Sequence, residues 1–187
     1  MKSAVKLALF FLLLFSFALA REDYRTYYSD IDTPAVWINP REIKVYVYPD
    51  EIKHYILKRS LNTWDDALGS NLNFKYINNP SEADITIKYV EKLSDNQAGI
   101  TKVNHLKIQG KIYLGKADVS VAKHSPSGWK FTDVQLNKIA LHEIGHAIGI
   151  LGHSENINDI MYYSTEMQRQ STLSSKDVET ARKIYGF

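Results

Sequence analysis

Residues 142–153 read HEIGHAIGILGH and place three histidines within twelve positions. On a helix, four residues turn the chain by about 400°, so His142 and His146 leave the same face about one turn apart. Two imidazoles in that relation can bind one Zn²⁺ at about 2.0–2.1 Å. With His153 as a third neutral imidazole, a fourth position stays open for water, which is typical of catalytic rather than structural zinc sites.

Two further residues of this segment suit such a site. Glu143 adjoins the first histidine, from where its carboxylate can contact a water on the metal without binding the metal itself. Gly149 can take a positive φ, which lets the helix end abruptly and the chain turn back so that His153 returns as the third ligand. The alternative is a buried helix that carries these residues but binds no metal. Such a helix would have unpaired polar groups on an apolar segment, which is energetically costly.

A carboxylate could replace His153 as the third ligand. Glu166 stands twenty residues beyond His146, a spacing known in thermolysin-like enzymes. That interpretation leaves Gly149 and His153 without a role. In addition, residues 164–170 are too polar to form a packed second helix. The three-histidine site is therefore the favoured hypothesis.

To bring these histidines together, the segment 142–153 must be positioned by regular secondary structure. Thr132-x-x-Gln135 has the form of a capping box and predicts a helix from there to about Ile148. Alternating apolar residues predict strands, and we expect an α+β domain with one main sheet. The predicted strands are 43–48, 72–76, 85–89 and two short ones near 98–103 and 107–114. Two other helices are predicted, one over about 51–68 and one that starts at Ser174. Residues 115–131 are expected to be mostly loop.

The first twenty residues have the form of a secretory signal peptide. Lys2 and Lys6 precede an apolar run, which ends in the small-residue pattern Ala18-Leu19-Ala20. The uncharged run is 14 residues long, whereas a membrane-spanning helix needs about 20. We therefore expect cleavage after Ala20 and export, with an uncleaved tether as the alternative. Residues 21–40 lack clean periodicity and are interpreted as an arm on a domain of residues 41–187.

Composition excludes several classes of protein. The chain has no cysteine, so disulfides, iron–sulfur clusters and a cysteine nucleophile are all excluded. Without Lys2 and Lys6 it carries 21 basic and 21 acidic residues, a balance that does not suggest a nucleic-acid partner. No second run is long and apolar enough to span a bilayer. We expect a monomer without nucleic acid and without stable membrane insertion after signal cleavage.

The histidine segment resembles the signature H-E-x-x-H-x-x-G-x-x-H of the metzincin metallopeptidases, and within that clan it is most similar to the matrixins, the matrix metalloproteinase family. Ser154 follows the third histidine, as it does in matrixins. Ile160-Met161-Tyr162 resembles the Met-turn of that family. Leu173-Ser174-x-x-Asp177 and Tyr185-Gly186 resemble the two ends of its last helix.

The resemblance implies zinc ligands at His142, His146 and His153, with Glu143 as general base and Met161 beneath the metal. It also implies a metzincin-like fold: a twisted, mostly parallel five-stranded sheet, two long helices, and a short C-terminal subdomain that ends in a helix. One catalytic zinc ion is expected. Calcium stays undecided, because calcium loops and a cluster for a second zinc are not recognisable; we interpret the remaining histidines, His54, His105 and His124, as ordinary surface or loop residues.

The activity implied by the resemblance is that of a secreted zinc-dependent endopeptidase. A zinc-activated water would attack the peptide bond while Glu143 moves its proton to the leaving amine. The substrate would be an extended polypeptide lying beside an edge strand near residues 98–103. A catalytically silent zinc-containing binding module is the alternative, and a secreted inhibitor or structural domain is a further one. Glu143 argues against the first, because a protein that only holds zinc does not need this carboxylate. The intact set of catalytic residues argues against the second.

One position departs from the matrixin pattern. Matrixins usually have proline two residues after the Met-turn methionine, whereas this chain has Tyr163. In astacin- and serralysin-like relatives, a tyrosine at that place can bind zinc as a fifth ligand or hydrogen-bond the reacting oxygen. The alternative is an aromatic side chain packed in the pocket wall.

Overall fold

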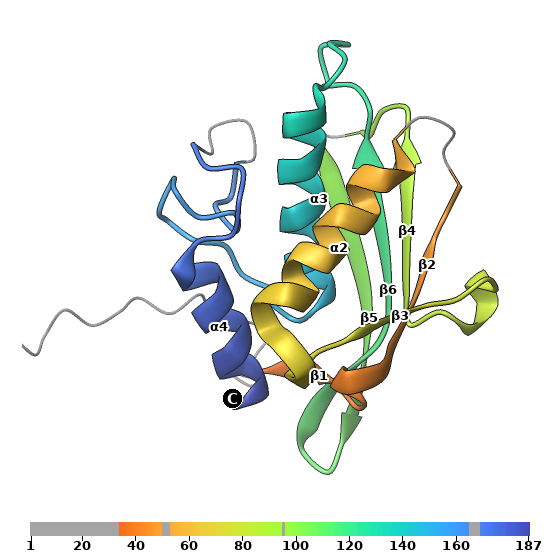
Figure 1. Cartoon of the computed structure of the whole chain (residues 1–187), viewed down its shortest axis with the longest axis vertical. Helices are drawn as coiled ribbons and strands as arrows, with labels where there is room; N and C mark the ends of the chain where they lie inside the picture. The colour runs from red at the N-terminus through yellow and green to blue at the C-terminus, as the bar shows by residue number, and fades with distance from the viewer. Residues whose placement is uncertain (1–33, 50–52, 95, 165–168) are drawn as a thin grey trace, which may run out of the picture.

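The computed structural model describes residues 34–49, 53–94, 96–164 and 169–187 (Figure 1). The predicted signal peptide, residues 21–33 of the predicted arm, and Glu166 lie outside these residues. Within the described ranges, no helix is both long and apolar enough to cross a membrane.

A mostly parallel sheet forms one layer of the molecule. Strands β3 (Phe74–Tyr76), β2 (Ile43–Val47), β4 (Ile85–Val90) and β6 (Lys111–Ala122) pair in that spatial order, all parallel. Strand β5 (Gly99–Ile108) pairs antiparallel with the other side of β6. This arrangement confirms the mostly parallel sheet that the resemblance implied.

The sheet has one strand more than expected. Residues Ala35–Trp37 form β1, which pairs in parallel with Ile112–Leu114 of β6. These three residues of the predicted arm at 21–40 thus belong to the sheet, and Ala35 and Trp37 are buried in the core. A strand of three residues is too short to show a periodicity in the sequence.

The hairpin of β5 and β6 also corrects the prediction. In place of two short strands and a loop over 115–131, the chain forms strands of 10 and 12 residues, so residues 115–122 belong to β6. The turn uses positive φ at Gln109 and Gly110. A register shift after Asn104, opposite Gly115, changes which residues of β6 face the core. Before the shift the even-numbered residues Ile112 and Leu114 are buried, and after it the odd-numbered residues Ala117 and Val119 are buried. Because this alternation of buried and exposed residues changes phase, the sequence pattern does not show one long strand.

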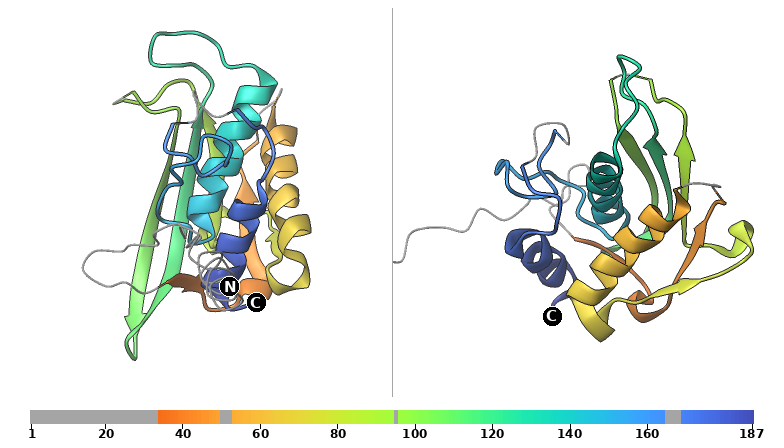
Figure 2. Two further views of the ribbon diagram at one scale, coloured as in Figure 1. Left: turned by 90° about the vertical axis from the view of Figure 1, so that its left-hand side faces the viewer. Right: turned by 45° about the horizontal axis from the view of Figure 1, so that its top comes forward.

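The helices form the second layer, on one face of the sheet (Figure 2). Helix α2 (His54–Leu68) ends at Gly69, and helix α3 (Asp133–Ala147) begins with the capping box of Thr132 and Gln135, as predicted. Helix α4 (Ser175–Tyr185) begins with a second capping box, made by Ser174 and Asp177. Short 3-10 turns lie at η2 (Pro40–Glu42), η3 (Gly69–Asn71) and η4 (Pro80–Glu82).

Two tryptophans attach α3 to its neighbours. Trp64 of α2 is fully buried, and its indole Nε1–H donates to the carbonyl oxygen of Leu141 at 2.9 Å. Trp37 of β1 donates in the same way to Ala147 at 3.0 Å. Both bonds satisfy the indole N–H inside the core, where an unpaired donor would be costly. They fix the height and rotation of α3, which carries the HEIGH segment.

Because Trp37 belongs to the core, its truncation should destabilise the whole domain. We expect Trp37→Ala to lower the free energy of unfolding by about 3–5 kcal/mol, the usual cost of removing a buried tryptophan. Ile38→Ala is the matched control, since this neighbouring side chain is 64% exposed; it should change that free energy by less than about 0.5 kcal/mol. Urea denaturation followed by tryptophan fluorescence measures both, and equal stabilities would contradict the core position of β1.

Candidate metal centre

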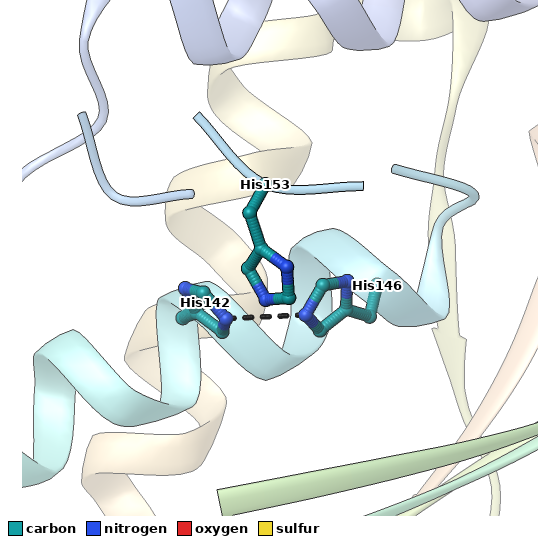
Figure 3. Close-up of side chains that lie close together, drawn as sticks. All are labelled: His142, His146 and His153. Atoms are coloured by element: carbon teal, nitrogen blue, oxygen red, sulfur yellow. Dashed lines mark hydrogen bonds between the residues drawn. The ribbon is translucent and has the colours of Figure 1, made fainter. Parts of the chain in front are cut away.

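The three histidines of the segment converge at one point (Figure 3). His142 and His146 leave α3 one turn apart, and their ring centroids are 4.7 Å from each other. After Gly149 the chain turns back and brings the ring of His153 to 5.2 Å from His142 and 4.9 Å from His146. One ligand atom from each histidine lies within 4.8 Å of the others.

Backbone carbonyls fix the protonation of two of these rings. The Nδ1 atom of His142 lies 2.7 Å from the carbonyl oxygen of Ile160, and that of His146 lies 2.6 Å from the carbonyl oxygen of Ile150. A carbonyl can only accept, so each Nδ1 carries the hydrogen and each Nε2 keeps a free lone pair. The two Nε2 atoms are 3.1 Å apart, the contact drawn as a dashed line in Figure 3. Two lone pairs at that distance need a proton or a metal ion between them.

Burial disfavours protonation of these two imidazoles. Desolvation, followed by the charge of His146, holds the pKa of His142 well below its usual range. Desolvation also lowers the pKa of His146 to about 4. A tetrahedral zinc ion with Zn–N bonds of about 2.0–2.1 Å needs nitrogens roughly 3.3 Å apart, close to the observed separation. The three-histidine site therefore fits a zinc ion.

Two glycines permit the close approaches around these histidines. Gly149 has φ of +106°, and a Cβ there would collide with the carbonyl oxygen of Ala35 in β1. Gly145 lies between the two helical histidines, and a Cβ there would collide with the sulfur of Met161. Met161 is fully buried, so the residue of the predicted Met-turn lies directly against the helix turn that carries His142 and His146.

A buried carboxylate holds the predicted Met-turn in place. Asp177, at the start of α4, is fully buried. Its Oδ2 accepts the backbone N–H of Ile160 at 2.9 Å and that of Ser174 at 2.8 Å, and its Oδ1 accepts that of Met161 at 3.1 Å. Ile160 is the residue whose carbonyl binds His142. Asp177 thus supports the orientation of the first histidine through a single residue.

Glu143 lies beside the histidines at the boundary of α3 and β5. Its side chain is 5% exposed, and the Oγ1 of Thr101 donates to its Oε2 at 2.7 Å. Burial raises the pKa of Glu143 to about 7, and the hydrogen bond from Thr101 opposes part of that rise. A carboxyl group with such a pKa can exchange a proton near neutral pH.

The metal centre opens into a cleft of about 840 Å³. Its lining includes the start of β5, from Gly99 to Thr101, and Tyr163. The Tyr163 side chain is 62% exposed, and its ring centroid lies 4.3 Å from that of Tyr162. Tyr163 therefore lies at the cleft, and its predicted role as fifth ligand or oxyanion donor stays a prediction. The rival ligand Glu166 lies outside the described residues.

The other histidines take no part in this centre. His124 pairs with Glu91, whose Oε2 is 3.4 Å from the imidazole Nδ1. Across the described part of the chain, His142, His146 and His153 form the only group of three or more potential metal-binding side chains.

Several residues that shape the site belong to no recognisable sequence motif. Thr101 and Gly99 contact Glu143, which is more than forty residues away in the chain. Their only sequence signal was their position in the predicted edge strand. Asp177 was recognised as a helix cap, but its contacts to the Met-turn depend on how α4 packs.

Comparisons with known proteins agree with this geometry. The sequence model of the matrixin family matches residues 42–186. The chain is similar to macrophage metalloelastase of Rattus norvegicus, with 28% identity over 153 residues, which are 76% of this chain and 32% of the relative. It is similar to metalloendoproteinase 1 of Glycine max, with 28% identity over 138 residues, 70% of this chain and 44% of the relative. The chain thus spans less than half the length of either curated relative.

Solved structures share the fold. A structure of myroilysin matches with a TM-score of 0.52 and 13% identity, over 82% of this chain and 96% of the other chain. Because the sequence identity is only 13%, this similarity shows a shared fold and nothing further.

The lowered histidine pKa values predict how zinc binding depends on pH. Three solvent-exposed imidazoles of pKa about 6.5 would lose roughly 60-fold in zinc affinity between pH 8 and pH 6, because protons compete for the nitrogens. Here burial lowers the pKa of all three histidines, that of His146 to about 4. We therefore expect a loss of less than about fivefold in that range and a steep loss only as pH approaches 4. Competition with a chromophoric chelator measures the affinity; a loss of the full 60-fold would contradict the desolvation of His142 and His146.

Asp177→Asn should damage both the fold and the metal site. The amide NH₂ cannot accept, so at least one buried backbone N–H loses its partner; we expect a loss of about 2–4 kcal/mol in unfolding free energy. Zinc affinity should fall about tenfold or more because the Ile160 carbonyl no longer orients His142. Glu155→Gln, at an exposed carboxylate of the same subdomain, is the control for both measurements. Unchanged zinc affinity in Asp177→Asn would contradict this supporting role.

Proposed function

Because the chain belongs to the matrixin family, we propose that it is a secreted zinc endopeptidase that hydrolyses internal bonds of extended polypeptides. The observation that carries the proposal is the buried Glu143 beside a three-histidine site, at the wall of an open cleft. The predicted signal peptide supports export.

His142, His146 and His153 would hold the metal ion. Zinc bound there would lower the pKa of a water molecule and polarise the carbonyl of the scissile bond. The protein contributes the orientation: the carbonyls of Ile160 and Ile150 keep two imidazoles in the tautomer that presents Nε2.

Glu143 is the proposed general base. It would accept a proton from the attacking water and deliver it to the nitrogen of the leaving amine, so the carboxylate is regenerated in each cycle. Its pKa of about 7 arises from burial, and a nearby divalent cation would favour the charged form. Tyr163, at the same cleft, is the proposed additional ligand or donor to the developing oxyanion, and Met161 the proposed floor of the site.

Strand β5 is the proposed binding edge for the substrate. In the described structure it pairs on one side only, with β6. Its first residues, Gly99 to Thr101, line the cleft. An extended polypeptide can add to such an edge through main-chain hydrogen bonds. Binding through the main chain suits cleavage inside a chain and recognises no free terminus.

The proposed organisation is a signal peptide at 1–20, an N-terminal arm at 21–40 and a catalytic domain at 41–187, with β1 of the arm joined to that domain's sheet. The mature protein is proposed to act as a monomer, without nucleic acid and without insertion in a membrane. Calcium stays undecided.

Cleavage of casein by residues 21–187 loaded with zinc tests the activity. We expect fragments from the wild type, none after chelation, and fragments again after zinc is restored. Glu143→Gln should lower kcat by about 10²–10⁴, the usual contribution of a general base; Glu155→Gln is the control carboxylate. Cleavage by Glu143→Gln at the wild-type rate would refute the role of Glu143. One bound zinc per chain without cleavage would favour the alternative, a silent binding module.

A further inference from the structure

Strand β5 lies unusually close to the Glu143 side chain. A Cβ added at Gly99 would be 2.6 Å from both the Cγ and the Oε1 atoms of Glu143. Only glycine leaves room for the carboxylate at this point. The strand that borders the cleft therefore also forms one wall of the space that contains the proposed base.

Thr101 contacts Glu143 at two points. Its Oγ1 lies 2.7 Å from the carboxylate Oε2 and 2.9 Å from the main-chain carbonyl oxygen of the same glutamate. Within the described residues, Thr101 is the only hydrogen-bond partner of the carboxylate. One hydroxyl that bridges the main chain and the side-chain end of a residue restricts the torsion angles between them.

Gly99 and Thr101 act on the same face of β5. Residues two apart in a strand point to the same side of the sheet, and both of these meet α3 through Glu143. Ile100, between them, points to the opposite side by the same alternation. The arrangement thus combines a glycine that leaves space with a threonine that fixes the side chain in it.

We propose that Thr101 is a positioning residue, whose hydroxyl holds the Glu143 carboxylate in the orientation needed for proton transfer. This inference rests on the proposed function of Glu143 as general base. The competing account is that Thr101 only attaches β5 to α3. The two accounts differ in what the loss of the hydroxyl changes: the rate of the chemical step in one, stability alone in the other.

The test compares Thr101→Val, which keeps the shape and loses the hydroxyl, with Thr101→Ser, which keeps the hydroxyl. We expect Thr101→Val to lower kcat for a peptide substrate about tenfold or more with KM within about twofold, because misplacement of a catalytic group acts on the chemical step. Thr101→Ser should stay within about threefold of the wild type. Zinc content should be unchanged in both variants.

Thr86→Val is the matched control. Thr86 is a buried threonine of strand β4, on the other side of β6 from β5, and its hydroxyl donates to Asp118 at 2.6 Å, away from the cleft. Its replacement should change stability and leave kcat as it is. If Thr86→Val and Thr101→Val lower kcat equally, or if Thr101→Val keeps full activity, the positioning role is refuted.

A double variant separates positioning from general damage. In a Glu143→Gln background, Thr101→Val should have almost no further effect on the residual rate, because the group it positions is gone. An undiminished tenfold effect in that background would overturn the proposal.

A crystal structure of Thr101→Val gives a readout that does not depend on activity. We expect the Glu143 carboxylate to leave its single wild-type position or to occupy several, while the backbone of β5 stays in place. A carboxylate that keeps its wild-type position would overturn the proposal. If the carboxylate moves as expected but the wild type cleaves no peptide, the positioning role stands and the proposed function fails.

Discussion

The geometry of the metal centre depends on two hydrogen bonds from imidazole N–H groups to main-chain carbonyls. They join His142 to Ile160 and His146 to Ile150, and they force both Nε2 lone pairs toward the same point. Each carbonyl belongs to a segment after α3, so the helix and the following chain must be placed accurately together. The glycine turn at Gly149, the Met-turn and Asp177 all serve that placement.

Strand β5 connects the proposed substrate site with the proposed general base. Its outer edge is the proposed site of the polypeptide, and its inner face touches the Glu143 side chain through Gly99 and Thr101. An edge strand with both contacts would place the main chain of a bound substrate and the Glu143 carboxylate in one rigid frame. Helix α3 completes that frame, because it packs against both strands of the β5–β6 hairpin and is attached by Trp64 and Trp37.

The features predicted correctly from the sequence are those that depend on local geometry. The four-residue spacing of His142 and His146 and both capping boxes depend only on helix geometry, so they were readable from short segments. The long strand β6 was missed because its alternation changes phase at the register shift near Gly115. Strand β1 was too short to show a pattern, and the contact of Thr101 with Glu143 depends on the packing of β5 on α3. Such contacts join distant parts of the chain, and one sequence alone carries no signal of them.

We propose that three imidazoles, with no carboxylate, bind one metal ion next to Glu143. The most direct measurement is a crystal structure of zinc-loaded residues 21–187, with anomalous scattering recorded at the zinc edge. We expect a single zinc peak at about 2.0–2.1 Å from one nitrogen each of His142, His146 and His153. A zinc peak elsewhere, or a bond from zinc to Glu143 or Glu166 in place of one of these histidines, would contradict it.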